Sequence, residues 1–210
     1  MRRSLVLAGL LLLTAGTALA QQDYPTVETS PAFMYIHNPG LLSGSSGFNC
    51  VGGGGTIAYN FSQYIGVAAD LGGCKVLNEN NTVLSGKVNG NEFTFLFGPR
   101  ITLRNSSKFQ PFFEVNFGGM RVSLSCQSSA VDCVAATNGA TYTKTAFALT
   151  AGGGFDIKMS KKFSIRLVQA EYLYTRFGNN CGFPVCSQNN SQNSFRLKSG
   201  IVINWGGGSK

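Results

Sequence analysis

The 210-residue sequence has few charged residues and, beyond its first 20 positions, no long apolar run. Asp, Glu, Lys and Arg make up 12% of it, against roughly 25% in an ordinary soluble domain. No later stretch holds 18 consecutive apolar residues, which excludes a helical membrane protein. Lys and Arg form no run, so the formal net charge of +8 gives little support to nucleic-acid binding.

What remains is rich in glycine and small polar residues. Hydrophobic residues account for an unexceptional 43%, and glycine fills 27 positions. Low charge together with ordinary hydrophobicity suits a barrel with lipid outside and a tight polar interior. The basic residues lie mainly at expected turns (Lys108, Lys161 and Lys162) and on polar strand faces, and those at the turns would lie near anionic head groups.

The N-terminus has the pattern of a cleaved export signal. Two arginines begin it, Leu5–Leu13 forms an apolar centre, and Ala18-Leu19-Ala20 is a small-residue cleavage site. We therefore expect a signal peptide over residues 1–20 and one exported domain over residues 21–210. Removing the two arginines would leave a net charge of +6.

Asn91–Arg104 alternates apolar and polar side chains almost without a break. Its apolar positions are Phe93, Phe95, Phe97, Pro99, Ile101 and Leu103. This is the period of a β-strand with two different faces, whereas a helix would spread the phenylalanines around its circumference. An aromatic face of this length suits a strand that crosses a bilayer, where roughly 9–11 tilted residues span the hydrocarbon.

The same alternation recurs along the chain and predicts eight strands. They are Ser30–His37, Gly47–Asn60, Tyr64–Val76, Asn91–Arg104, Phe109–Ser125, Tyr142–Met159, Lys162–Phe177 and Ser194–Trp205. Short turns alternate with longer loops, and the loops are Asn38–Ser46, Leu77–Gly90, Cys126–Ala140 and Gly178–Asn193. The phase of the alternation changes at Gly118-Gly119, where we expect a β-bulge, and again near Val168-Gln169.

Alternation alone does not say which face points inward, because a soluble lipocalin-like barrel has its apolar face inside. Here the apolar faces carry bulky side chains that eight strands could not enclose, while the polar faces are rich in small residues. Aromatic residues also fall near strand ends, as in membrane barrels. We predict an all-β fold, an eight-stranded antiparallel up-and-down transmembrane β-barrel. The facing of the first strand stays open, because Phe33 and Tyr35 compete with Met34 and Ile36 for the lipid side.

The tight turns predict which inward charges meet, because faces must match across a hairpin. A turn centred on Ser107 places Arg100 opposite Glu114. A turn centred on Lys161 places Asp156 opposite Arg166. A buried charge is costly unless it is paired, so we expect these four residues to form two lumen charge pairs.

Six cysteines in an exported chain favour disulfides over metal ligation. A turn centred on Ser62 places Cys50 opposite Cys74, which predicts a cross-strand pair near the outer mouth. The other cysteines can close small rings within two loops: Cys126 with Cys133, and Cys181 with Cys186. One histidine and no C-x-x-C spacing disfavour a zinc site, and no cofactor site is expected.

The most specific pattern lies at the C-terminus. Lys198-Ser199-Gly200-Ile201-Val202-Ile203-Asn204-Trp205 looks like the β-signal of outer-membrane proteins, with Lys198, Gly200, Ile203 and Trp205 at its defining positions. By resemblance, that signal is read by the barrel-assembly machinery. Ile203 stands where an aromatic residue is more usual, and five residues follow Trp205.

With this ending, the eight strands and the export signal, the mature chain resembles the OmpA/OmpX-like eight-stranded outer-membrane β-barrel family, barrel domain only. The resemblance implies a location in the outer membrane of a Gram-negative-type bacterium, among outer-membrane lipids and lipopolysaccharide. It also implies a non-enzymatic structural or surface-interaction role, with a filled polar lumen and long disulfide-pinned extracellular loops that could bind an extracellular ligand or surface.

Two other functions stay open. The lumen could form a narrow pore for ions or small solutes. Some eight-stranded outer-membrane barrels modify lipid A with a His, a Ser and a carboxylate, and His37 lies near Ser43, Ser45 and Ser46. No adjacent motif fixes a nucleophile or an orienting acid, so we expect no catalytic residue.

Overall fold

A computed structural model describes residues 24–39, 48–76, 79–81, 86–126, 142–178 and 191–206. The regular elements in these ranges are β1 (Val27–Asn38), β2 (Phe48–Asn60), β3 (Ile65–Val76), β4 (Glu79–Asn81), β5 (Gly86–Thr102), β6 (Phe109–Cys126), β7 (Tyr142–Lys158), β8 (Phe163–Arg176) and β9 (Ser191–Trp205). No helix within them is long and apolar enough to span a membrane. The expected signal peptide, residues 1–20, lies outside the described residues.

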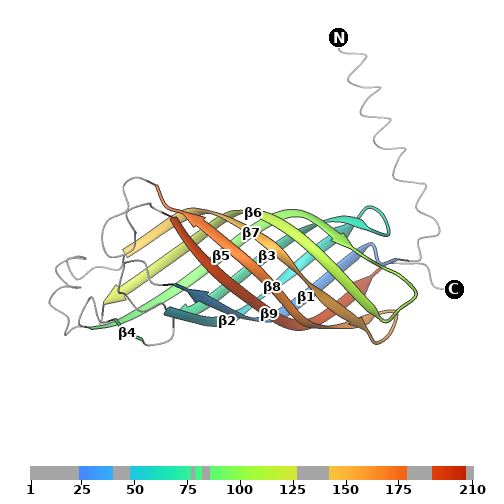
Figure 1. Ribbon diagram of the computed structural model, residues 1–210, viewed down its shortest axis with the longest axis horizontal. Helices are drawn as coiled ribbons and strands as arrows, with labels where there is room; N and C mark the ends of the chain where they lie inside the picture. The colour runs from blue at the N-terminus through green and yellow to red at the C-terminus, as the bar shows by residue number, and fades with distance from the viewer. Residues whose placement is uncertain are drawn as a thin grey trace, which may run out of the picture.

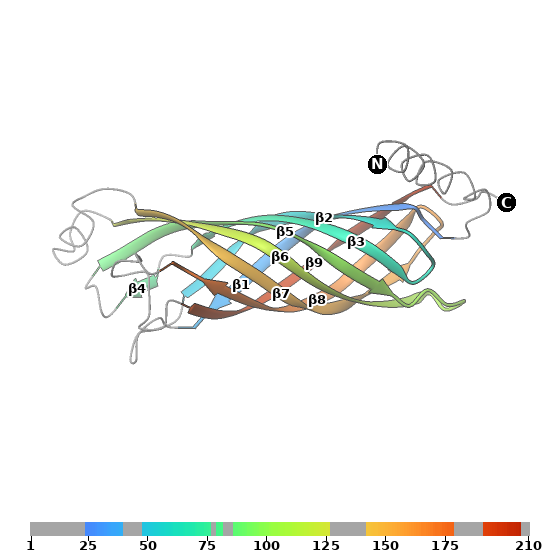
Figure 2. The same cartoon turned by 90° about the horizontal axis from the view of Figure 1, so that it is seen from above.

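Eight long strands form one closed antiparallel barrel, with the strands tilted steeply against its long axis (Figures 1 and 2). Each long strand pairs with its neighbours in sequence, and β1 pairs with β9 to close the ring. The short β4 pairs with β5 alone, beyond the point where β3 and β5 pair. The predicted fold class is therefore confirmed.

Three tight turns, at residues 61–64, 103–108 and 159–162, lie at one end of the barrel, here called the short-turn end. Serine hydroxyls accept backbone hydrogen bonds in these turns: Ser62 Oγ from the N–H of Ile65, at 3.0 Å, and Ser160 Oγ from that of Phe163, at 3.1 Å. Such side-chain acceptors are why serine favours tight turns. The opposite end, where residues 40–47, 127–141 and 179–190 join the strands, is called the long-loop end.

One predicted loop is shorter than expected. Leu77–Gly90 was assigned entirely to a loop, but β4 lies within it and β5 begins at Gly86. Asn80 pairs with Lys87 there, so a small two-stranded extension continues the wall of the barrel past the lipid-facing residues of β5. The alternation of apolar residues does not reach this extension, so no strand could be predicted there from the pattern.

The inward and outward faces follow the alternation, and the structure settles the open case in β1. Met34 and Ile36 are buried, while Phe33 points outward and is 57% exposed. A register shift does lie in β8, where Phe155 pairs with Val168 but Asp156 pairs with Arg166. This β-bulge moves the inward phase from even to odd positions.

The bulge expected at Gly118-Gly119 is absent, because the pairing of β6 with β5 and with β7 runs through both glycines without a shift. The apolar Met120 and Val122 instead point into the lumen. Gly119 is covered by the ring of Phe95 on the neighbouring strand, and a Cβ there would come within 2.3 Å of Phe95 Cζ. The alternation of apolar and polar residues changes phase here because apolar side chains enter the lumen, while the backbone pairing stays regular.

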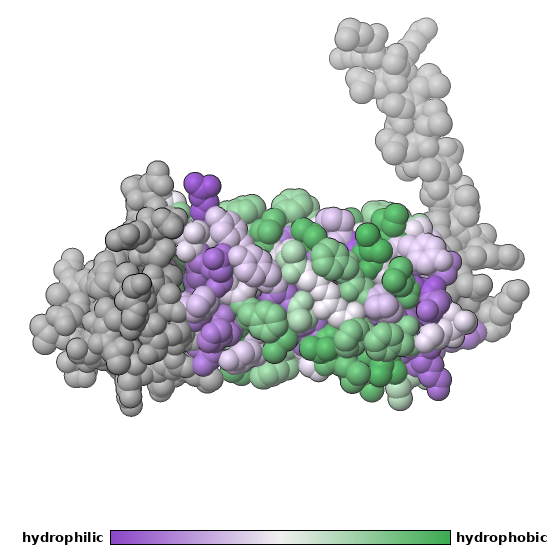
Figure 3. Space-filling view, in the orientation of Figure 1, coloured by the Kyte–Doolittle hydropathy of each residue, from purple (hydrophilic) through white to green (hydrophobic). Residues whose placement is uncertain are grey.

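Large apolar side chains cover the outside of the barrel. Figure 3 shows them as a broad band on the visible face, with hydrophilic residues toward both ends. Exposed members include Ile57, Val67, Leu71, Phe93, Phe97, Phe113, Phe147, Ile165, Tyr172, Phe195 and Ile201. Exposing this band to water would be energetically costly. The surface therefore suits a hydrocarbon surrounding.

Candidate functional site

The interior is the candidate site, because the polar chemistry of the described chain gathers there. Adjacent strands of its wall lie so close at some positions that only glycine fits. A Cβ at Gly98 would come within 1.9 Å of the carbonyl oxygen of Val115 on the adjacent strand. Charged side chains from non-adjacent strands fill the rest of the space and are nearly all excluded from solvent.

One ion network occupies the half of the lumen nearer the short-turn end. Arg166 binds Asp156 through two contacts, Nε to Oδ1 at 2.9 Å and Nη2 to Oδ2 at 3.0 Å. Arg100 reaches the same carboxylate at 3.3 Å and Glu28 Oε2 at 3.3 Å. Arg104 forms an ion pair with the other oxygen of Glu28. The three arginines thus share two carboxylates that come from β1 and β7.

The ring of Phe112 packs against this network from β6. The guanidinium carbons of Arg100 and Arg166 both lie 4.3 Å from its centroid, within the range of a cation–π interaction. Arg166 Nη1 also donates to Gln169 Oε1 at 2.9 Å, and Gln169 Nε2 donates to Glu114. Glu114 is therefore joined to the network through an amide rather than by a direct ion pair.

A second network lies further toward the long-loop end and contains equal numbers of acids and bases. Arg196 Nε binds Glu171 Oε2 at 2.7 Å, and its Nη1 binds Asp70 Oδ1 at 2.9 Å. Lys198 forms an ion pair with Asp70 and lies 3.5 Å from Glu171 Oε2. Two anions and two cations from β3, β8 and β9 therefore neutralise one another without water-exposed partners.

An apolar layer covers the networks on the long-loop side. It is formed by inward side chains of seven strands: Met34, Ile36, Cys50, Cys74, Val76, Leu96, Met120, Val122, Ala146, Ala148 and Leu173, with Phe177 just past the end of β8. Buried polar side chains, among them Asn38, Glu92 and Ser194, lie between these residues, so the layer is mainly but not wholly apolar. The lumen is thus ionic toward the short-turn end and mainly apolar toward the long-loop end.

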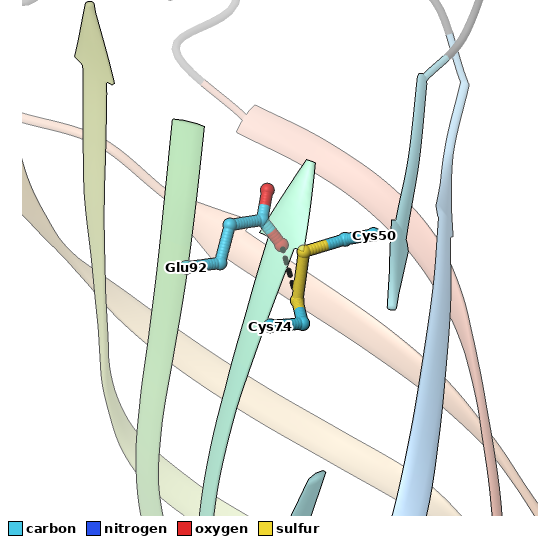
Figure 4. A group of neighbouring side chains, drawn as sticks. All are labelled: Cys50, Cys74 and Glu92. Atoms are coloured by element: carbon cyan, nitrogen blue, oxygen red, sulfur yellow. Dashed lines mark hydrogen bonds between the residues drawn. A yellow bond between two sulfur atoms is a disulfide. The ribbon is translucent and has the colours of Figure 1, made fainter. Parts of the chain in front are cut away.

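Within this layer lies a small cluster of Cys50, Cys74 and Glu92 (Figure 4). The cysteines form a disulfide with a Cα–Cα distance of 5.5 Å. Glu92 Oε1 accepts a hydrogen bond from Asn38 Nδ2 at 3.2 Å. Glu92 Oε2 lies 3.8 Å from Sγ of Cys74, which carries no proton in the disulfide and so donates no hydrogen bond.

The two predicted lumen charge pairs have different outcomes in the structure. Asp156 lies opposite Arg166 and forms the two-contact ion pair described above. Arg100 lies opposite Glu114 in the register, but within the described residues its ion partners are Glu28 and Asp156. Proximity along two paired strands therefore did not decide the partner of Arg100.

The predicted register of the cysteine hairpin is wrong by two residues. Cys50 lies opposite Val76, and Cys74 lies opposite Gly52, because the turn is centred on Gln63 rather than on Ser62. The disulfide consequently runs diagonally across the two strands. Gly52 leaves room for it, since a Cβ there would come within 2.8 Å of Cys74 Cβ. The other predicted rings, Cys126 with Cys133 and Cys181 with Cys186, lie outside the described side chains.

Several residues that meet in the lumen were not among the predicted charge pairs. They are Glu28, Asp70, Glu92, Arg104, Phe112, Glu171 and Arg196. Their inward position on each strand was a usable signal, because every one of them shares a face with small residues. Contacts such as Arg104 with Glu28 and Arg196 with Asp70 were not, because they cross the lumen between strands that are not neighbours. Arg196 with Glu171 is different, since these two residues lie opposite each other on adjacent strands.

The residues of the C-terminal pattern have distinct positions in β9. Lys198 is part of the second network, and a Cβ at Gly200 would come within 2.2 Å of the carbonyl oxygen of Pro31 on β1. Ile203 pairs with Thr29 and with Phe163. Trp205 Nε1 donates to Thr29 Oγ1 at 3.0 Å. This strand therefore supplies the seam that closes the barrel.

His37 lies on the outer face of β1, not in the lumen. Its Nδ1 is 2.9 Å from Asn49 Oδ1, an amide oxygen rather than a carboxylate. Tyr35 donates to the same oxygen at 2.7 Å. Ser43, Ser45 and Ser46 lie outside the described residues.

Comparison with known families decides what kind of barrel this is. The family described as the outer membrane protein beta-barrel domain matches residues 5–201. The chain belongs to this family. This outer-membrane barrel has no significant match among curated proteins.

Solved structures show the same fold. Neisserial surface protein A is 13% identical, with a TM-score of 0.56 over 86% of this chain and 97% of that chain. OprG from Pseudomonas aeruginosa is 13% identical, with a TM-score of 0.50 over 88% and 98%. Membership of this family places the protein in the outer membrane of a Gram-negative-type bacterium, in contact with its lipids.

Proposed function

We propose that this outer-membrane barrel is non-enzymatic and has a closed lumen, and that its role is structural or one of surface interaction at the long-loop end. The observation that carries the proposal is the interior itself. Two ion networks and a mainly apolar layer fill it, and their side chains are nearly all excluded from solvent. Eight strands leave a space that side chains can fill, unlike the wider porins.

Single-channel recording tests the closed lumen against a narrow pore. The purified barrel, inserted into a planar bilayer in concentrated salt, should give no discrete conductance steps. A matched variant, Met120→Gly with Leu96→Gly, thins the apolar layer without removing a charge. Reproducible steps from the unaltered protein would contradict the proposal and favour the pore.

The alternative of lipid A modification predicts a chemical product. Overexpression should leave the mass spectrum of lipid A unchanged, because His37 faces outward and its described partner is an amide. The appearance of a lipid A species that gained or lost an acyl chain, and that His37→Ala abolished, would instead establish the enzyme.

We further propose that the outer surface binds the phosphates of lipopolysaccharide. Every Asp and Glu whose side chain the structure describes is buried in the lumen, so the exposed charges on these ranges are basic. Arg121 and Arg176 face outward near the long-loop ends of β6 and β8, where Arg121 pairs with Phe93 and Arg176 with Phe147. They therefore lie where the aromatic lipid face ends, at the level of anionic head groups.

Replacing both arginines by Gln should weaken binding of purified lipopolysaccharide to the folded barrel. A basic residue near an anionic surface contributes about 1 kcal/mol, so the loss should be about thirtyfold for the pair. The matched control is Lys161→Gln with Lys162→Gln, which removes two exposed charges at the short-turn end. Equal binding by the arginine variant and the unaltered barrel would contradict this site.

The signal peptide, the local disulfide rings and recognition by the barrel-assembly machinery remain part of the proposal. The C-terminal pattern Lys198, Gly200, Ile203 and Trp205 supports the last of these, since it lies on the strand that closes the barrel. Loops pinned by Cys126–Cys133 and Cys181–Cys186 would present a fixed surface to an extracellular ligand. Deletion of Cys181–Cys186 should then reduce adhesion of cells to such a surface without lowering the amount of barrel.

A further inference from the structure

Glu92 is a buried carboxylate whose contacts within the described chain are all neutral. It is 2% exposed, and its partners are the amide of Asn38 and the sulfur of Cys74. Glu28, Asp70, Asp156 and Glu171, by contrast, each contact an arginine or a lysine, and Glu114 accepts from the amide of Gln169 outside the apolar layer. An ionised carboxylate in an apolar layer is costly unless positive charge joins it. The Glu92 carboxylate would therefore be stabilised by a bound cation or by a proton.

Two sulfur atoms lie beside this carboxylate. Sγ of Cys50, Sγ of Cys74 and one carboxylate oxygen of Glu92 all lie within 4.8 Å of one another, and they come from β2, β3 and β5 (Figure 4). In a tetrahedral zinc site with Zn–S bonds of about 2.3 Å, neighbouring donor atoms are about 3.5–4 Å apart. Small side-chain rotations would bring the three donors to that spacing once the sulfurs are no longer bonded to each other.

We propose that the dithiol form of this cluster binds a divalent cation of the zinc type through the Cys50 and Cys74 thiolates and the Glu92 carboxylate. Cysteines enter every polypeptide as thiols, so the dithiol form precedes the disulfide. Binding releases the two thiol protons and forms two metal–sulfur bonds and one metal–oxygen bond. The ion and the disulfide exclude each other, because both use the same two sulfur atoms.

A polar contact that the disulfide does not need supports the site. Asn38 donates to Glu92 and accepts from Ser194 Oγ, at 2.5 Å, so the amide is held in place and holds the carboxylate in turn. Groups that orient metal ligands in this way commonly accompany protein metal sites. Here Asn38 and Ser194 fix the position of the Glu92 carboxylate, which a disulfide alone would not require.

The disulfide is not the only link between β2 and β3. β2 and β3 pair without interruption from Cys50 and Val76 at one end to Asn60 and Gly66 at the other. The dithiol chain should therefore fold into the same barrel and present the three donors together. This expectation makes the proposal testable on the full chain.

The experiment uses a background in which the other four cysteines are Ser: Cys126, Cys133, Cys181 and Cys186. The dithiol protein is refolded from urea into detergent under argon, and heat-modifiable migration verifies the barrel. Cd²⁺ alone is the first probe, read by the ultraviolet band of thiolate-to-cadmium charge transfer, and Zn²⁺ competing with a coloured chelator is the second. We expect one ion per folded chain, and no band once the disulfide has formed.

Two variants separate this site from general thiol chemistry. Cys50→Ser with Cys74→Ser should bind no ion. Glu92→Gln keeps both thiols and nearly the same shape, and should weaken binding about tenfold or more. Absence of the band from the dithiol barrel, unchanged affinity in Glu92→Gln, or failure of the dithiol chain to form the barrel would each overturn the proposal.

Discussion

Replacing Arg196 by Met should lower the free energy of unfolding by about 3–5 kcal/mol, the usual cost of removing one partner from a buried ion pair. The side chain is 0% exposed, and it contacts Glu171 at 2.7 Å and Asp70 at 2.9 Å. Lys198 is then the remaining cation for both carboxylates. One buried negative charge is left uncompensated, and that charge is the source of the destabilisation.

The structure also predicts how to reverse the effect. Glu171→Gln combined with Arg196→Met removes one anion and one cation, and Lys198 stays paired with Asp70. Replacing a whole buried pair by neutral groups of similar size is often close to neutral. The double variant should therefore be more stable than Arg196→Met alone, although it carries one more substitution.

Reversible urea unfolding in detergent micelles provides the assay. Trp205 is the single tryptophan of the chain, so its fluorescence reports on the closing strand, and heat-modifiable migration reports on the barrel. Lys162→Met, on an exposed turn, is the matched control and should change stability by about 0.5 kcal/mol at most. If Arg196→Met stays within 1 kcal/mol of the unaltered barrel, or if the double variant is the less stable of the two, the reasoning about lumen charge is wrong.

Three further outcomes follow from other contacts. In the background that lacks the other four cysteines, Cys50→Ser with Cys74→Ser should cost about 3 kcal/mol, since the crosslink spans 24 residues; a reductant should have the same effect on the disulfide form and none on the variant. Phe112→Leu removes the ring from two guanidinium groups and should cost about 2 kcal/mol, while Phe113→Leu on the lipid face should cost less in the same urea assay; the reverse order would contradict the cation–π contacts. Trp205→Ala should lower the amount of barrel in the outer membrane, measured by immunoblot. Trp205→Phe should not, because it keeps the terminal aromatic residue and loses only the hydrogen bond to Thr29; equal loss in both variants would assign the effect to that hydrogen bond.

The sequence predicted the wall of the barrel well because strand faces depend on local alternation. Pairing across a hairpin depends only on the turn, so Arg100 could be placed opposite Glu114. A turn centred one residue away from the expected one moves every pair by two, and this is what happened at Gln63. The disulfide between Cys50 and Cys74 forms even so, because it can run diagonally between the two strands.

The interior was harder to predict, for two physical reasons. Contacts across the lumen, such as Arg104 with Glu28, depend on the stagger of the whole closed sheet, which no single hairpin reveals. The rule that inward residues are polar also fails in the apolar layer. Met120 and Val122 therefore resembled a slipped strand, when they were inward residues of a regular one.

The second ion network has a consequence for how the barrel assembles. Its acids lie on β3 and β8, but both of its bases lie on β9, the strand that pairs with β1 to complete the ring. A sheet that lacks only this strand would carry Asp70 and Glu171 without counterions beside hydrocarbon. Insertion of the final strand therefore neutralises charge at the same step at which it satisfies the open backbone edges. Incomplete barrels are disfavoured both by the uncompensated charges and by the open backbone edges. Closure is therefore an all-or-none event.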